Sequence, residues 1–349
     1  MKMEERDQFD TSYGLFKFKR TLPKDLESAM GLVGESVLFK KLIMQNYDEY
    51  YRLIDIPEEG DWLSTHKEYG QTYAEYINAG YNSGCVQVDE NRDTIYITPL
   101  CFLKDDIIDQ DFLTKIYQYC QAYFYGMKVR VEQIESNFRS VEAKKYEDGK
   151  MQINGKQFLE RLSKDVPKNA FCLIGLVDTD FYIENMDHNG HINYKILYEI
   201  RNISKRTCIF SFDKFDPLSY VDKSSVSIEK KKRVNDIILK RVCKAITYQI
   251  CTMFGMKNCI YFNCNMNGVG SLEEIDKRFF DLCPICLRKL YTNIQSKGRD
   301  LRTFRVKNCF DLINRLEKMK EVIYENLYDN FELEYQWIEK RLEFLKTLL

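Results

Sequence analysis

The chain has 349 residues, 44% hydrophobic and 30% charged, so it can bury a substantial core in one elaborated domain or in two. Its 52 basic and 53 acidic residues give a net charge of −1, which excludes a general electrostatic attraction to nucleic acid or anionic membranes. No apolar run approaches the roughly 20 residues of a membrane span, and the charged start lacks the apolar run of a secretory signal. We therefore expect a cytoplasmic or otherwise intracellular protein.

The first part of the chain combines short helical patterns with polar connectors. The spacing of its apolar residues predicts helices over 24–30 and 34–44. The segment that follows Gly60 is rich in Trp and Tyr, and it predicts an ordered loop that packs Trp62 and its neighbours. We assign residues 1–90 to an N-terminal extension that packs on the core.

From residue 93 onwards the pattern becomes that of an α/β protein. Alternating or continuous apolar runs predict strands, and apolar residues at helical spacing predict helices. The predicted strands are 94–98, 127–131, 170–177 and 206–213, and the predicted helices are 111–125 and 154–164. The run 170–177 (AFCLIGLV) has no polar residue, so we expect a central strand covered on both faces.

A polar basic loop is predicted over 223–232, and a long helix over 234–254. Gly255 then supplies the left-handed residue that commonly ends such a helix. Two amphipathic helices are predicted near the C-terminus, over 306–328 and 332–349. We divide this part of the chain into a subdomain at 91–255 and a C-terminal subdomain at 256–349.

Four cysteines follow the long helix at close spacing. Cys259 and Cys264 form one pair, and Cys283 and Cys286 form a second pair with Pro-Ile between the thiols. Two short-spaced thiol pairs are a common way to hold one tetrahedral zinc ion with no open coordination position. The sequence therefore predicts one structural Zn²⁺, whose binding in model peptides is worth roughly 10–16 kcal/mol.

The end of the long helix carries the spacing of a second kind of zinc site, without its ligands. Zinc peptidases with the signature H-E-x-x-H-x-x-G-x-x-H bind the metal through three histidines, and the glutamate is the general base. This chain has Gly255 in place, but Tyr248, Thr252 and Asn258 stand at the histidine positions and Gln249 at the glutamate. A phenol with a pKa near 10, an alcohol and an amide are poor zinc ligands, and glutamine cannot accept a proton.

The block from Tyr248 to Leu290 resembles the archaemetzincins, whose motif is HExxHxxGxxHCx₄CxM followed by CxxC. Further segments that resemble this family are 60–63, 171–182, 210–217 and 337–341. The resemblance implies an α/β (α+β) metzincin-like zincin domain with a mixed β-sheet, an active-site helix, a Cys₄ zinc module and C-terminal helices.

Carried over residue by residue, the resemblance implies that Cys259, Cys264, Cys283 and Cys286 bind the second zinc. Met266 matches the methionine that forms a turn beneath the catalytic metal. The catalytic positions themselves depart from the family pattern, so we expect no catalytic residue in this chain.

Our leading hypothesis is an inactive relative of a metallopeptidase that acts as a protein-binding or structural component of an assembly. A former peptide groove beside a sheet edge can accept an extended peptide by strand addition. The first alternative is a divergent metallopeptidase or other hydrolase, in which Cys251 or Cys243 is the nucleophile.

The second alternative is nucleic-acid binding through the zinc module. It depends on clustered positive charge. The candidate basic residues are Lys230–Arg233, Arg278, Arg288 and Lys289. Acidic neighbours dilute this charge, so we do not expect nucleic acid as the partner.

The three histidines do not restore the missing ligands. His188 and His191 lie in a polar, turn-rich segment, where such a pair is typical of surface. His66 lies beside Trp62, and we expect it to be a hydrogen-bonded loop residue. The eight cysteines outside the two pairs are predicted to be small buried thiols.

Overall fold

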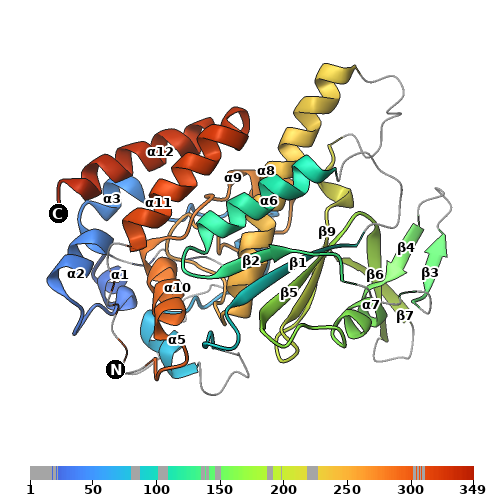
Figure 1. Ribbon diagram of the computed structural model, residues 1–349, viewed down its shortest axis with the longest axis horizontal. Helices are drawn as coiled ribbons and strands as arrows, with labels where there is room; N and C mark the ends of the chain where they lie inside the picture. Colours follow the sequence, from blue (N-terminus) through green and yellow to red (C-terminus); the bar gives the residue numbers. More distant parts are fainter. Residues whose placement is uncertain are drawn as a thin grey trace.

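The computed structural model describes residues 18, 21, 23–79, 87–100, 109–134, 138, 141–145, 151–186, 192–197, 199–217, 227–301, 304, 306, 308 and 311–349. Cys85, Cys101, Cys309, His188 and His191 lie outside the described residues, so the predictions made for them stay predictions. Within the described chain, two sheets lie on one side of the molecule and most helices gather on the other (Figure 1).

The larger sheet has five strands in the order β2-β1-β5-β9-β8. The strands are β1 (Thr94–Leu100), β2 (Lys128–Val131), β5 (Ala170–Val177), β8 (Glu199–Asn202) and β9 (Thr207–Ser211). All neighbours pair in parallel except β8, which runs antiparallel to β9 at one edge. Every residue of β5 is buried in the middle of this sheet, which confirms the expected central strand.

Helices cover both faces of the larger sheet. Because side chains alternate along a strand, Cys172 and Ile174 face the core formed with α6 (Gln110–Tyr123) and α8 (Ile228–Met253). Leu173 and Val177 face a second, smaller core that includes residues of α7 (Gly155–Leu162). The mixed α/β class expected from the sequence is confirmed.

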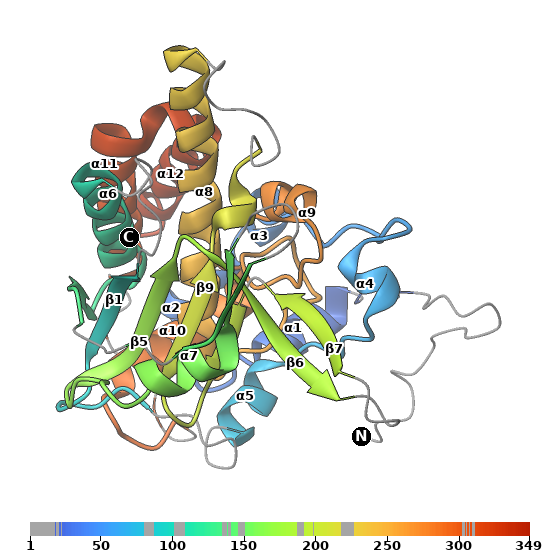
Figure 2. The ribbon, with the colours of Figure 1, turned by 90° about the vertical axis from the view of Figure 1, so that its right-hand side faces the viewer.

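The smaller sheet has four strands in the order β3-β4-β6-β7. Its strands are β3 (Ala143–Lys145), β4 (Met151–Asn154), β6 (Asp180–Met186) and β7 (Ile192–Leu197). The chain leaves β4 directly into α7, whose first turn is capped by the side chain of Asn154. Figure 2 shows β6 and β7 as a ribbon beside the larger sheet.

The remaining helices lie in two groups. The N-terminal group is α1 (Pro23–Met30), α2 (Val37–Met44), α3 (Tyr47–Tyr50), α4 (Trp62–Thr65) and α5 (Tyr73–Ala79). The C-terminal group is α9 (Leu272–Lys277), α10 (Pro284–Ser296), α11 (Asp311–Val322), a π-helix (Ile323–Leu327) and α12 (Tyr328–Lys346). The larger hydrophobic core contains buried residues from both groups, from Leu26 to Leu345. Among the described helices, none is both long and apolar enough to cross a membrane.

Three boundaries differ from the sequence prediction. Strand β1 continues through Pro99, which pairs in parallel register with Leu176. Residues 228–232, expected in a basic loop, form the first turn of α8, because the Ser227 side chain accepts the amide hydrogen of Lys230 and caps the helix. The last helix, α12, begins at Tyr328 directly after the π-helix, and the break predicted between residues 328 and 332 is present as a kink at Phe331, whose φ of −125° and ψ of 27° are not helical.

A buried ion pair joins the C-terminal helices to the segment that carries the second thiol pair. Arg315 of α11 donates from Nη1 to Asp281 Oδ2 at 2.9 Å and from Nε to the carbonyl of Tyr123 at 2.7 Å. Both charged side chains are only 1% exposed. The carbonyl of Asp281 also accepts the amide hydrogen of Asn265, so the Asp281–Arg315 pair connects α11, α6 and the cysteine loop.

Removing one charge of this pair leaves the other buried and uncompensated. We predict that Asp281→Asn lowers the free energy of unfolding by about 3–5 kcal/mol. Glu229→Gln, which removes an exposed ion pair with Arg233, is the control and should change it by less than about 1 kcal/mol. Urea denaturation followed by circular dichroism measures both; equal effects would contradict the assigned role of Asp281.

Candidate metal centre and vestigial catalytic site

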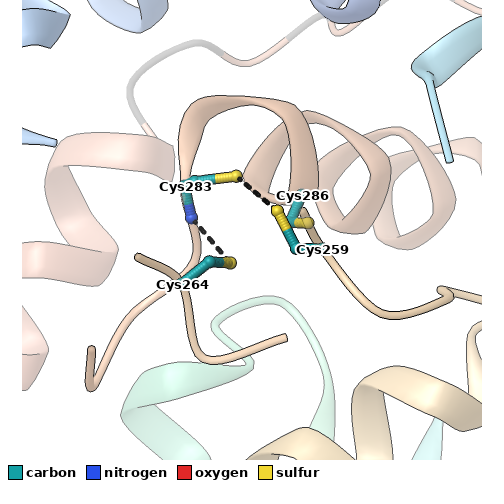
Figure 3. Close-up of side chains that lie close together, drawn as sticks. All are labelled: Cys259, Cys264, Cys283 and Cys286. Atoms are coloured by element: carbon teal, nitrogen blue, oxygen red, sulfur yellow. Dashed lines mark hydrogen bonds between the residues drawn. The ribbon is translucent and has the colours of Figure 1, made fainter. Parts of the chain in front are cut away.

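The four cysteines of the predicted zinc module come from two segments. Cys259 and Cys264 lie in the loop that follows the Gly255 turn, and Cys283 and Cys286 belong to the start of α10. Cys283 is the N-cap residue, and Pro284 occupies the first helical position, where its missing N–H costs no hydrogen bond. The spacing of three residues then places Cys283 and Cys286 on one side of the first turn (Figure 3).

All four sulfur atoms lie within 4.8 Å of one another and all four residues are buried. Cys259 Sγ and Cys283 Sγ are 3.7 Å apart, too far for a disulfide bond. Four thiolates at about 2.3 Å from a tetrahedral zinc would be about 3.8 Å from one another. The cluster therefore has the donors and the size to hold one zinc ion.

Backbone and side-chain hydrogen bonds fix the loop around these sulfurs. The amides of Met266 and Cys283 donate to Cys264 Sγ at 3.4 and 3.2 Å. The Asn267 side chain donates to the carbonyl of Cys259 at 2.8 Å and accepts from the amide of Cys264 at 2.7 Å. Such contacts orient metal ligands, and amide donors stabilise thiolate charge.

Bringing four thiols together in the interior has an electrostatic consequence. Burial raises the pKa of Cys264 and of Cys283 well above the usual range. Burial also opposes ionisation of Cys259, but hydrogen bonds from the other three thiols outweigh it and lower its pKa. A dication supplies the charge that allows all four sulfurs to ionise, because a coordinating thiol is deprotonated by its metal.

The signature helix ends as the motif predicts. Helix α8 stops at Met253, and Gly255 adopts a positive φ of 81°, which permits the sharp turn that leads towards Asn258. Tyr248 donates its hydroxyl hydrogen to Asn258 Oδ1 at 2.7 Å. The side chains at two of the three histidine positions of the signature are therefore hydrogen-bonded to each other.

The other two replaced positions are occupied by local hydrogen bonds. Thr252 donates to the carbonyl of Gln249 at 2.7 Å, within its own helix. The Gln249 side chain is 1% exposed, and its Oε1 accepts from the thiol of Cys208 on β9 at 3.5 Å. Gln249 thus contacts the sheet.

Residues before α5 extend this hydrogen-bonded set. Asn258 Nδ2 donates to Glu68 Oε1 at 2.6 Å, and Trp62 Nε1 donates to the same oxygen at 3.0 Å. The indole lies directly on Gly268, where an added Cβ would be 2.3 Å from Trp62 Nε1. We call Tyr248, Asn258, Glu68 and Trp62 the vestigial cluster.

The N-terminal segment is also fixed to the turn of the signature. Gln71 donates to the carbonyl of Gly255 at 3.2 Å and accepts from the amide of Lys257 at 3.3 Å. His66 stacks on Trp62 with ring centroids 3.5 Å apart, and Thr65 Oγ1 lies 2.9 Å from its Nδ1. His66 is thus a loop residue that packs on Trp62.

Charged residues surround the phenol of Tyr248. Arg278 lies over its ring at 5.0 Å, and Arg201 of β8 pairs with Glu199 at 3.1 Å. Burial raises the pKa of Tyr248, the charge of Glu199 adds to this effect, and Arg201 and Arg278 oppose it. The phenol therefore stays protonated near neutral pH and is a hydrogen-bond donor.

Most of the residues on which the two alternatives depended are buried. Cys243 and Cys251 are fully buried, and burial raises the pKa of both thiols, so neither is a reactive thiolate. Arg288 and Lys289 are each 1% exposed and bond to the N-terminal segment, the first to Glu35 and the second to Gln71. Arg278 is also buried, so of the candidate basic residues only Lys230–Arg233, in the first turns of α8, are exposed.

Sequence reasoning did not identify Glu68, Asn267 or Arg278 as parts of the two sites. Glu68 is far from residue 248 in sequence, and no local pattern connects the two. Asn267 offered a weak signal, because it lies three residues after Cys264, where an asparagine side chain can bond the loop backbone.

Three comparisons relate the chain to known proteins, and the family match lies on the part that carries both sites. The sequence profile of Peptidase family M54 matches residues 220–292. Archaemetzincin-2 of Rattus norvegicus is 27% identical over 285 residues, which cover 75% of each chain. Human archaemetzincin-1 is 24% identical over 212 residues, covering 57% of this chain and 42% of the relative. The crystal structure of archaemetzincin from Methanopyrus kandleri superposes with a TM-score of 0.41 at 17% identity, covering 59% of this chain and 97% of that one.

These sequence matches show that the chain is similar to Peptidase family M54 and to the archaemetzincins. The protein is archaemetzincin-like in this sense. Its buried cysteine cluster fits the zinc dependence of such proteins with one ion.

The zinc content of cysteine variants tests whether the cysteine cluster binds the metal. We predict about one zinc per purified chain by elemental analysis, and loss of that zinc in Cys264→Ser and Cys283→Ser. Cys120→Ala changes a buried thiol of α6 outside the cluster and should keep the zinc. Zinc retained in full by both serine variants would contradict the assignment.

Proposed function

We propose that this protein is a catalytically inactive, archaemetzincin-like pseudopeptidase with one structural zinc, and that it acts as a protein-binding or structural component of an assembly. The observation that carries the proposal is the vestigial cluster. At the former metal position, Tyr248 donates to Asn258 and Asn258 donates to Glu68, so polar groups there bond to one another.

The chemistry of these groups supports inactivity. Zinc hydrolysis needs a metal-bound water whose pKa is lowered, and a carboxylate that accepts its proton. Tyr248 keeps its proton, Thr252 bonds its own helix, and Gln249 contacts β9. Trp62, which belongs to the cluster, lies over Gly268 and donates to Glu68.

The strand at the edge of the larger sheet supports a binding role. Strand β8 is the last strand on its side, and its Arg201 contributes to the environment of Tyr248. An extended peptide can pair with such an edge through backbone hydrogen bonds. We propose that this edge, next to the vestigial cluster, contacts a protein partner. We also propose an intracellular location, because none of the nine cysteines among the described residues forms a disulfide bond.

Restoring the signature tests the proposal. The variant Tyr248→His/Gln249→Glu/Thr252→His/Asn258→His should bind two zinc ions where the natural chain binds one. A second variant adds Glu68→Ala and Trp62→Ala, because these residues contact the restored site. We predict no turnover of a peptide library by the natural chain with added zinc. The proposed inactivity would be contradicted if the natural chain cleaved peptides in a chelator-sensitive way and bound a second zinc tightly.

A further inference from the structure

Helices α11 and α12 lie side by side at one end of the molecule, away from both sheets (Figure 1, Figure 2). Between them is an open hollow of about 370 Å³. Glutamates and tyrosines dominate its lining: Glu317, Glu321, Glu339, Glu343, Tyr324 and Tyr335. We call this surface the α11–α12 groove.

Three tyrosines at the groove expose aromatic surface. The ring centroids of Tyr324, Tyr328 and Tyr335 lie 5.3–6.1 Å from one another, with Tyr324 66% exposed. Tyr324 belongs to the π-helix between α11 and α12, and π-helical turns often occur at functional sites. A cluster of exposed aromatic rings is typical of a binding surface.

The charges of the groove are suited to an ammonium group. Lys320 of the chain itself lies 5.3 Å from the Tyr335 ring and donates to Glu339 at 2.6 Å. Tyrosine faces and carboxylates attract a lysine in this arrangement. Within the part of the chain that the structure describes, Glu343 is exposed and has no ion-pair partner. The groove lining has four glutamates against two lysines.

Glu343 also borders a second hollow, of about 590 Å³, on the other side of α12. That hollow is lined by Tyr50, Trp337 and Phe344, with Leu333 76% exposed at its edge. Glu343 therefore stands between an acidic, tyrosine-lined hollow and an aromatic one. A chain that crosses α12 can place a cation beside Glu343 and an apolar side chain in the second hollow.

We propose that the α11–α12 groove is a docking site for a basic, lysine-bearing peptide segment of a protein partner. The proposal rests on the protein-binding role proposed above, but it uses no residue of the vestigial cluster. Nucleic acid and anionic membranes do not fit the groove, because its glutamates repel phosphate. Peptide lysines can replace the groove's own lysines, because exposed ion pairs contribute little to stability.

Fluorescence anisotropy with a labelled peptide of alternating lysine and leucine tests the proposal on the full chain. We expect saturable binding at low salt that weakens as salt is added. Glu343→Lys should weaken binding about tenfold, because it replaces an attraction by a repulsion. Tyr324→Ala should weaken it about fivefold through loss of ring contact. Glu160→Lys reverses an exposed charge on α7, remote from the groove, and should leave binding unchanged.

The absence of saturable binding, or equal weakening by Glu160→Lys, would overturn the proposal. Light scattering could instead show a dimer that Glu343→Lys dissociates. That result would overturn the proposal, because the groove would then bind a second copy of this chain. The groove variants should leave zinc content and the absence of turnover unchanged. A titration without peptide binding would therefore refute the docking site but not the proposed catalytic inactivity. Turnover by the natural chain would refute the proposed inactivity but not the docking site.

Discussion

The convergence of four buried sulfurs at the start of α10 is the constraint on which the C-terminal half of this structure depends. Four buried thiolates would be costly without a cation, and a zinc ion offsets their charge while joining the cysteine loop to α10. Asn267, Met266 and the Asp281–Arg315 pair then fix the backbone around the sulfurs. The same contacts hold the loop that carries Asn258 and Gly268. The zinc module therefore helps to position the residues of the vestigial cluster.

The cysteine cluster and the replaced signature positions differ in their chemistry. A structural site needs four good donors and nothing else, and Cys259, Cys264, Cys283 and Cys286 supply them. A catalytic site needs donors, an open coordination position and a base. Tyr248 and Asn258 are poor zinc ligands, and they bond to one another, while Glu68 accepts from both Asn258 and Trp62. The polar groups of this cluster are hydrogen-bonded to one another.

Much of this structure could be predicted from local sequence. The apolar run 170–177 is β5, the helix that ends before Gly255 is α8, and the thiol spacing identified the cysteines that come together. Contacts between distant segments could not be predicted in this way. Glu68 reaches Asn258 across 190 residues, and Arg288 pairs with Glu35 across 253, so neither leaves a periodic pattern. The start of α8 was missed because a serine cap acts through one hydrogen bond, which composition does not reveal.

X-ray absorption at the zinc edge of the purified, natural protein tests the central claim most directly, because it reports the atoms bound to the metal. The account predicts a single shell of four sulfur atoms at about 2.3 Å. A shell that includes nitrogen or oxygen ligands at about 2.0–2.2 Å would place zinc at another site and contradict it.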